Sequence, residues 1–144
     1  MTFFTMKEII ETSERKGAKI SDVALEMESK ETGLSADEIM KKMAYNYEIM
    51  KNSVSQGISK IIPSISGLTG GEGYRLWQNV KNGLSGETIL KASSRAMAVS
   101  NVNASMGRIV AAPTAGSCGI IPGVLMTVAE KLGKSDADVV KALI

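Results

Sequence analysis

Helix start and stop signals recur along the chain and constrain its fold more than any other feature of the sequence. Thr5 stands three residues before Glu8, and Ser35 stands three residues before Glu38, which is the spacing of a capping box at a helix N-terminus. Glycine follows several of the apolar segments, and it ends helices readily because it adopts left-handed backbone angles without steric cost. The chain therefore reads as a series of helices joined by short loops.

The helices expected from these signals share a capping residue or a glycine near at least one end. They are predicted over residues 5–16, 21–31, 35–56, 71–82, 86–106, 119–132 and from 135 onward, with Thr5, Ser21, Ser35, Thr69, Ser85 and Ser135 as caps and Gly17, Gly33, Gly57 and Gly133 as stops. Pro122 is expected in the first turn of its helix, where no intrahelical donor is needed. Residues 108–112 are strand-like but stand alone. We predict an all-α fold, a compact multi-helix domain with glycine-rich loops between its helices.

Apolar residues in the longest predicted helix recur at intervals of one, three and four. They are Ile39, Met40, Met43, Tyr47, Met50 and Val54. This spacing places them on one side of a helix, so we interpret the stripe as core and not as a cofactor site.

The composition excludes several classes of partner. The net charge of +2 comes from 17 basic and 15 acidic residues scattered along the chain, and only 4% of the residues are aromatic, so nucleic-acid binding is not indicated. The N-terminus lacks a signal-peptide pattern, and the longest apolar run, at residues 119–129, is too short to span a bilayer. We expect a soluble, cytoplasmic protein with no membrane partner.

Cysteine and histidine usage limits the chemistry further. Cys118 is the only cysteine and the chain has no histidine. Internal disulfides, multi-cysteine metal sites and histidine-dependent nucleophilic catalysis are therefore excluded within the chain. We assign no catalytic residue and no metal ligand.

Residues 108–125 have the arrangement of a binding site. An apolar approach at 109–112 leads to a loop of small residues at 113–119 and then to an apolar helix. Backbone N–H groups at a helix N-terminus lack intrahelical partners and favour a carboxylate or phosphate. Thr114, Ala115, Gly116 and Ser117 are thus candidate substrate-binding residues. The plain alternative is that Thr114 or Ser117 merely caps the helix while the glycines make the turn.

Two further groups of residues are candidates. Asn101 and Asn103 lie among small residues that we expect to be buried; we interpret Asn101 as structural and leave Asn103 open between structure and ligand binding. The loop at 61–74 matches neither the P-loop nor the dinucleotide fingerprint. Its Thr69, Gly70 and Gly71 could approach a ligand, or the loop is a connector in which Thr69 caps the next helix.

The motif NASMGRIVAAPTAGSCGIIPGVL at residues 103–125, together with GLTGG at 67–71, closely resembles the alpha chain of iron–sulfur-dependent L-serine dehydratase. The resemblance covers essentially the whole chain. It implies conversion of L-serine to pyruvate and ammonia without pyridoxal phosphate, by means of a [4Fe-4S] cluster held by three cysteines. The unligated iron would act as a Lewis acid on the serine hydroxyl while a base removes the α-proton.

The resemblance also implies roles for particular residues. Thr114, Gly116 and Ser117 would contact the substrate near the cluster, and Asn103 and Arg108 would support their loop. The family's alpha chain continues further and carries its cluster cysteines there, so the ligands are expected outside this chain and Cys118 is not one of them.

On this reading the chain, 1–144, is the N-terminal half of the alpha-chain catalytic domain, truncated after Ile144 and inactive alone. Its expected partners are L-serine, the beta chain or beta domain and the missing C-terminal half of the alpha chain, in an oligomer.

Two readings compete with this one. The chain could be a non-enzymatic helical module that binds a small carboxylate or other anion at the 114–119 loop. It could also be a purely structural half whose apolar end at 139–144 packs on a partner, and an unburied end of this kind predicts self-association.

Overall fold

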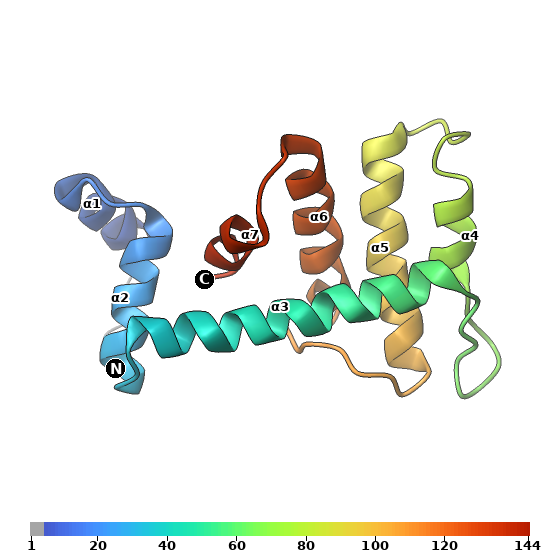
Figure 1. Ribbon diagram of the computed structural model, residues 1–144, viewed down its shortest axis with the longest axis horizontal. Helices are drawn as coiled ribbons and strands as arrows, with labels where there is room; N and C mark the ends of the chain where they lie inside the picture. The colour runs from blue at the N-terminus through green and yellow to red at the C-terminus, as the bar shows by residue number, and fades with distance from the viewer. Residues whose placement is uncertain (1–4) are drawn as a thin grey trace. The chain divides into compact units, whose positions relative to one another are not determined.

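The computed structural model describes residues 5–144, which form seven α-helices (Figure 1). Their bounds are α1 Met6–Lys16, α2 Ile20–Thr32, α3 Ala36–Ser59, α4 Glu72–Gln78, α5 Glu87–Ala104, α6 Ser117–Leu132 and α7 Asp136–Ala142. Within the described residues there is no strand, and one isolated bridge pairs Pro63 with Gly70. The predicted all-α class is confirmed, whereas the strand-like run at 108–112 has no regular structure. The helices form two compact units, 5–44 with 140–144, and 45–139.

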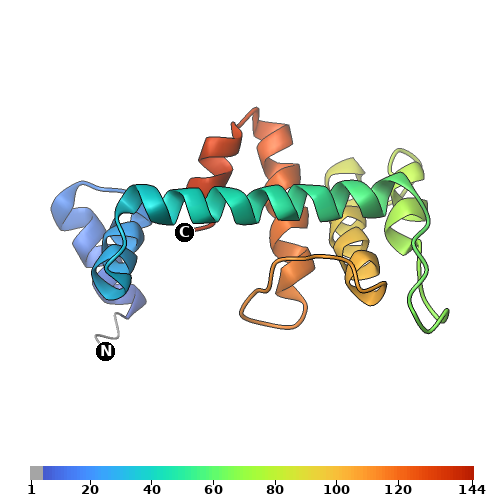
Figure 2. The same ribbon diagram turned by 60° about the horizontal axis from the view of Figure 1, so that its bottom comes forward.

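The first unit contains α1, α2 and the start of α3 (Figure 2). Its capping boxes at Thr5 and at Ser35 form as predicted, since the backbone N–H of Glu8 donates to Thr5 Oγ1 at 3.3 Å and that of Glu38 donates to Ser35 Oγ at 3.3 Å. The predicted cap at Ser21 is wrong, because α2 already begins at Ile20. Instead, the Asp22 side chain closes the start of the helix by accepting the backbone N–H of Lys19.

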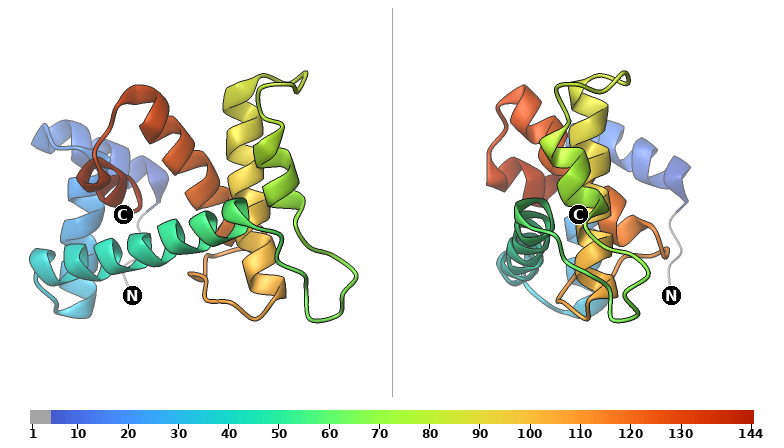
Figure 3. Two further views of the ribbon diagram at one scale, coloured as in Figure 1. Left: turned by 45° about the vertical axis from the view of Figure 1, so that its right-hand side comes forward. Right: turned by 90° about the vertical axis from the view of Figure 1, so that its right-hand side faces the viewer.

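The second unit is built around α5, with α4 and α6 on either side of it (Figures 1 and 3). Glycines let the neighbouring helices approach its backbone. A Cβ added at Gly57 of α3 would lie 2.5 Å from the Ala98 carbonyl oxygen, and one added at Gly73 of α4 would lie 2.5 Å from the Ala98 nitrogen. On the opposite side, a Cβ at Gly119 of α6 would lie 2.6 Å from the Ala96 carbonyl oxygen. Gly57 therefore does not end α3 as predicted, since it is a packing contact inside the helix.

The core of the second unit confirms the predicted stripe on α3. Tyr47, Met50 and Val54 are buried, as is Ile39 in the first unit, while Met40 and Met43 are partly buried. Facing residues of α5 complete the core, because Val99 and Val102 are fully buried.

A buried arginine ties α5 to its two neighbours. Arg95 Nη1 donates to Thr127 Oγ1 at 2.7 Å, its Nη2 pairs with Glu130, and its guanidinium lies 5.1 Å from the centre of the Trp77 ring. Lys91 also pairs with Glu130, at 2.8 Å, and Lys91 and Arg95 hold the pKa of the Glu130 carboxyl below its usual range. These contacts fix the register of α4, α5 and α6 around the site described below.

Several predicted helix boundaries shift because glycine, and not a hydroxyl, precedes the helix. Neither Thr69 nor Ser85 caps a helix. Helix α4 follows Gly71, with φ 81°, and α5 follows Gly86, with φ 83°. Neither of these two described helix starts has a side-chain cap. The fourth helix also ends at Gln78, earlier than predicted. The sixth begins at Ser117, so Pro122 is an interior residue and not a first-turn residue.

The last helix begins with a capping pair, in which the Asp138 N–H donates to Ser135 Oγ at 3.3 Å. Val139 and Val140 are buried, with 4% and 5% of their surface exposed, whereas Ala142 is exposed and Leu143 and Ile144 are partly exposed, so the apolar end at 139–144 is covered only in part. Among residues 5–144, no helix is long and apolar enough to cross a bilayer.

Candidate functional site

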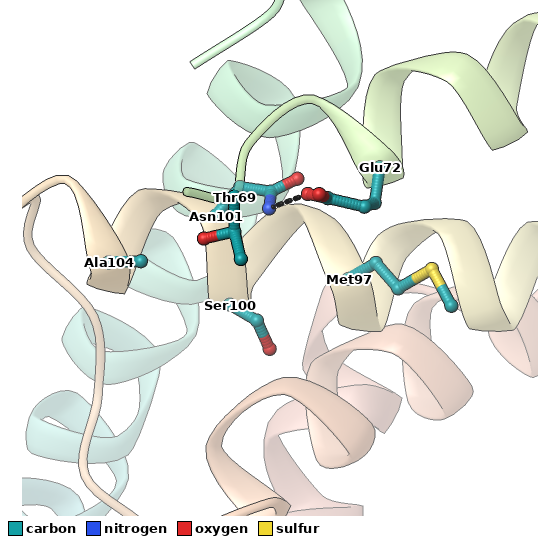
Figure 4. Close-up of a pocket in the computed structure, with 6 residues that line it drawn as sticks. All are labelled: Thr69, Glu72, Met97, Ser100, Asn101 and Ala104. Atoms are coloured by element: carbon teal, nitrogen blue, oxygen red, sulfur yellow. Dashed lines mark hydrogen bonds between the residues drawn. The ribbon is translucent and has the colours of Figure 1, made fainter. Parts of the chain in front are cut away.

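A pocket of about 400 Å³ opens in the second unit between α5 and the start of α4 (Figure 4). It is lined by Thr69, Glu72, Met97, Ser100, Asn101 and Ala104. Its wall therefore combines hydroxyls, an amide and a carboxylate with an apolar thioether and a methyl group. Most of the exposed wall is apolar, and its few polar groups line an open pocket.

The loop at 60–71 carries Thr69 to the edge of this pocket. The Ser64 N–H donates to the Thr69 carbonyl at 2.9 Å, and the Thr69 N–H donates to Ser64 Oγ at 3.2 Å, so the loop folds back on itself. Gly70 makes this turn possible, since its φ is 144° and a Cβ there would lie 2.5 Å from the Ile62 carbonyl oxygen. The glycines of the loop are thus needed for its backbone geometry.

A fixed carboxylate is the most polar feature of the pocket. Glu72 Oε1 accepts the Gly70 N–H at 3.0 Å, and its Oε2 accepts Asn101 Nδ2 at 2.5 Å (Figure 4). Asn101 Oδ1 in turn accepts the Gly73 N–H at 3.1 Å. The N–H groups of Gly70 and of Glu72 itself, followed by the Asn101 amide, hold the pKa of the Glu72 carboxyl below its usual range. Glu72 is therefore an anion at neutral pH.

The loop at 105–116 leads from the end of α5 to α6 and is anchored at both of its sides. Met106 has φ 64° at the end of α5, and the Gly107 N–H donates to the Val102 carbonyl at 2.8 Å. Further along, Arg108 Nη2 donates to Tyr45 Oη at 2.8 Å, with the guanidinium 5.5 Å from the centre of that ring. Arg108 thus holds the loop against α3, in line with the supporting position predicted for it.

The start of α6 is open and carries no acidic residue in its first turn. The Thr114 N–H donates to Ser117 Oγ at 3.0 Å, and this hydroxyl donates to the Thr114 carbonyl at 2.6 Å. Ser117 therefore closes a local turn before the helix, whereas the helix cap is Gly116, so neither Thr114 nor Ser117 is the N-cap that the alternative interpretation expected. Thr114, Ala115 and Gly116 are exposed, so nothing in the described chain covers the helix start.

The start of α6 lies beside the pocket without lining it. A Cβ at Gly119 would lie 3.5 Å from Ser100 Oγ, and Ser100 is a pocket residue that faces α6 in Figure 4. Of the two loops singled out by the sequence, the first therefore contributes Thr69 to the pocket wall, whereas Thr114 and Ser117 of the second stay outside it.

The structure separates the two asparagines of α5. Asn101 is buried and bonded to the start of α4, which confirms its structural reading, and it also lines the pocket. Asn103 is exposed, contrary to the burial expected for it, and it is not among the residues lining the pocket. The two differ because α5 turns by about 100° per residue, so residues two apart face different sides.

Sequence reasoning missed four residues that line the pocket, Glu72, Met97, Ser100 and Ala104. Glu72 had a usable signal, because it directly follows Gly70 and Gly71 at the start of a predicted helix, where an acidic side chain meets free N–H groups. Met97 and Ser100 had none, since their place depends on how α4 and α6 pack against α5.

The described chain contains no cluster that would hold a metal ion: within residues 5–144 no three His, Cys, Asp or Glu side chains converge. Cys118 lies at the start of α6, where its Sγ donates to the Ala115 carbonyl at 3.4 Å.

Comparisons with known proteins identify relatives of this chain. The family model for the serine dehydratase alpha chain matches residues 15–144. A probable L-serine dehydratase alpha chain of Bacillus subtilis (strain 168) is 39% identical over 143 residues, which are 98% of this chain and 47% of the relative. An L-serine dehydratase alpha chain of Peptoniphilus asaccharolyticus is 37% identical over 129 residues, 88% of this chain and 44% of the relative. The chain thus spans about half the length of these relatives. No solved structure matches it.

Proposed function

Because this chain belongs to the serine dehydratase alpha-chain family, we propose that it is one part of an L-serine dehydratase, which converts L-serine to pyruvate and ammonia. The observation that carries the proposal is the family match over residues 15–144, supported by 39% identity across 98% of the chain to a named relative. These matches do not favour the alternative of a non-enzymatic anion-binding module. The pocket between α4 and α5 supplies the candidate place for the substrate.

Glu72 is the proposed partner of the substrate's ammonium group. Its carboxylate lines the pocket and is held in place by Gly70 and Asn101. A general base works best when its pKa lies near the working pH, and the pKa of Glu72 is lowered away from it. We therefore assign Glu72 to binding and not to removal of the α-proton.

The start of α6 is the proposed partner of the substrate's carboxylate. Its N–H groups and helix dipole favour an anion, and no acidic side chain competes in the first turn. Thr114, Ala115, Gly116 and Ser117 form this wall of the proposed site. Arg108 supports it through Tyr45.

The remaining candidates frame the site without touching the reacting atoms. Thr69 lines the pocket, and Gly70 and Gly71 shape the loop that carries it. Asn103 supports the second loop, since its carbonyl accepts the Met106 N–H at 3.0 Å.

An iron–sulfur cluster does not fit the residues of this chain. A [4Fe-4S] cluster is held by cysteine thiolates, and the sequence has Cys118 alone. We place the cluster ligands of the intact enzyme in the remaining part of the alpha chain and derive no step through the cluster here. On this proposal the enzyme also contains a beta chain or domain, assembles as an oligomer in the cytoplasm, and is inactive when this chain is alone.

The proposal is tested by co-expressing this chain anaerobically with the remaining alpha-chain segment and the beta chain of its source organism, and measuring pyruvate formed from L-serine. Turnover is expected from the assembly and none from this chain alone. Glu72→Gln should raise KM for L-serine by roughly tenfold or more, because it removes a charged hydrogen-bonding partner of the ammonium. Glu31→Gln, an exposed carboxylate on α2, is the matched control and should leave KM unchanged.

A substrate analogue sharpens the assignment. Because 3-hydroxypropanoate lacks the ammonium group, its inhibition constant should be nearly the same for the parent assembly and for Glu72→Gln. An equal loss for both ligands would show that Glu72 only shapes the pocket. Absence of pyruvate from a correctly assembled, cluster-loaded complex would refute the proposed activity.

A further inference from the structure

An uncharged apolar strip runs along the neighbouring helices α5 and α6. On α5 it includes Ile89 and Met97, which are 61% and 44% exposed. On α6 it includes Ile120, Val124 and Val128, which are 56%, 43% and 42% exposed. The spacing of four and eight residues places the members of each helix on one side of it. We call these five residues the α5–α6 strip.

The two halves of the strip lie on the same face of the helix pair. On α5, Ala98 is covered by α3 and α4, and Ala96 is covered by the glycines of α6. The strip residues of α5 lie between the side covered by α3 and α4 and the side covered by α6. Ser100, which Gly119 approaches, lies on the same side of α5 as the strip. Ile120 directly follows Gly119 and therefore emerges beside Ser100. The opposite side of α6 carries Pro122, which is fully buried.

The strip has the character of an interface. Its five residues are all aliphatic or thioether side chains, and the residues of α5 between them on the same side, Ser93 and Ser100, are small. Exposed apolar residues gathered on one side of a helix pair are typical of a surface that another polypeptide covers. Small residues would allow another helix to come close to the α5 backbone.

The strip is continuous with the pocket. Met97 belongs to both, and Ser100 and Ala104 extend the same side of α5 into the pocket wall. Two more exposed apolar residues lie near that end, Ile65, whose N–H donates to the Ala104 carbonyl at 3.0 Å, and Met106, which is 83% exposed. A polypeptide that covered the strip would therefore also close the mouth of the pocket, and a closed pocket excludes water from its ligand.

The lengths of the relatives indicate what covers this surface. This chain corresponds to 47% of one alpha chain and 44% of another, so about half of each relative has no counterpart in it. In an intact alpha chain that half is tethered to this one, and tethering gives it a high effective concentration at any surface that it can reach. A second copy of this chain or a beta chain has no such advantage.

We propose that the α5–α6 strip is the docking surface for the remaining part of the alpha chain, and that docking roofs the pocket between α4 and α5. The inference rests on the proposed function for the identity of the partner, but its test reads binding and not turnover. Supplied as a separate polypeptide, the remaining segment should bind this chain with a measurable dissociation constant.

Lysine substitutions in the strip test the surface. Ile120→Lys and Val124→Lys should each weaken binding by roughly tenfold or more, since each removes buried apolar contact and places a charge in the interface. Leu84→Lys is the matched control, because Leu84 is fully exposed in the same unit and lies outside the strip. Binding would be measured by titration calorimetry, with circular dichroism to show that each variant is folded.

Hydrogen exchange provides a second measurement that needs no variant. The complex should protect amides of residues 89–104 and 117–128 more than those of residues 20–32 on α2. Unchanged binding by both lysine variants, or protection confined to other helices, would overturn the proposal. The proposal would also be overturned if this chain formed concentration-dependent dimers that Ile120→Lys abolished and that the remaining alpha-chain segment did not displace. A complex that binds as proposed yet forms no pyruvate would instead refute the proposed activity alone.

Discussion

The chain contains two loops of small residues that each lead into a helix, and they differ in what meets the helix start. At α4 the helix start is occupied by the chain's own carboxylate, because Glu72 accepts the Gly70 N–H. At α6 the first turn has no acidic residue, and the turn that leads into it is closed by the Ser117 hydroxyl and by the Ser117 N–H, which donates to the Thr114 carbonyl at 3.0 Å. The first start therefore presents a negative charge to the pocket, whereas the second has no acidic side chain in its first turn.

This difference assigns opposite ligand groups to two places that look alike in sequence. An anionic wall favours an ammonium, and a helix start without a carboxylate favours an anion. Both starts pack on α5, where Gly73 of α4 approaches Ala98 and Gly119 of α6 approaches Ser100 of the pocket wall. On the proposed function, these are the places that bind the ammonium and the carboxylate of L-serine.

The largest expected effect on stability comes from the difference in packing between the start of α4 and the start of α6. In Gly73→Ala the new Cβ would lie 2.5 Å from the Ala98 nitrogen and 2.6 Å from its Cα, and these backbone atoms cannot rotate away. Overpacking costs about 1–3 kcal/mol, occasionally more, and exceeds the gain of up to about 1 kcal/mol in helix propensity. We expect a loss of about 2 kcal/mol in the free energy of unfolding, measured by urea denaturation.

Gly116→Ala is the comparison at the other start. Its nearest contact would be Ile120 Cδ1 at 3.7 Å, and Gly116 has φ −86°, which alanine adopts without strain. The change in unfolding free energy should stay within about 0.5 kcal/mol. Equal effects of the two substitutions would show that the α4 start is not held by its packing on α5.

The next effect follows from the charge at the two starts. The pKa of Glu72 is lowered from an ordinary value of 4.5, so the folded state favours its carboxylate. The stability that this carboxylate contributes is present above pH 4.5 and is lost as the pH falls through the folded pKa. The difference in unfolding free energy between the parent and Glu72→Gln should therefore be constant from neutral pH down to about pH 4.5. It should shrink as the pH falls further.

Ser117→Ala supplies the contrast, because it removes a neutral hydroxyl from the α6 start. It should cost about 1 kcal/mol, because it removes the hydrogen bonds that join the Ser117 hydroxyl to the Thr114 backbone. Urea unfolding at neutral and at acidic pH should give the same cost for this variant. A cost that fell with pH as it does for Glu72→Gln would contradict the charge difference between the two starts.

The helices were predictable where local chemistry decides them. Capping pairs at Thr5, Ser35 and Ser135 act over three residues, and the αL glycines at 17, 33 and 133 end their helices as expected. Gly57 was misassigned because its role depends on Ala98, which is distant in sequence. A glycine that ends a helix and one that admits a neighbouring helix look the same in a sequence.

The candidate site was predictable only in its loops. The sequence leaves Thr69 open between ligand binding and helix capping; it lines the pocket and caps no helix, while Arg108 bonds Tyr45, and the ligand-binding roles of both remain predictions. The carboxylate of Glu72 and its partner Asn101 come from different helices, so their pairing follows from the packing of α4 on α5. The predicted burial of Asn103 is wrong, because the end of α5 is more exposed than its small residues suggest.

The smallest expected effect concerns how the two loops make their left-handed residues. The first loop uses glycine, with φ 72° at Gly67 and 144° at Gly70, whereas the second begins with Met106 at φ 64°. Left-handed angles cost a residue with a Cβ roughly 1–2 kcal/mol, and glycine loses about 0.5–1 kcal/mol through its freer unfolded chain. Since Met106 is 83% exposed, Met106→Gly gives up little packing and should stabilise this chain by about 0.5 kcal/mol, seen as a higher urea midpoint.

Leu84→Gly, at an exposed position whose φ is not positive, should lower the midpoint. If Met106→Gly lowered it as well, the methionine side chain would be contributing contacts that outweigh its backbone strain, and the two loops would then differ less than their dihedral angles indicate.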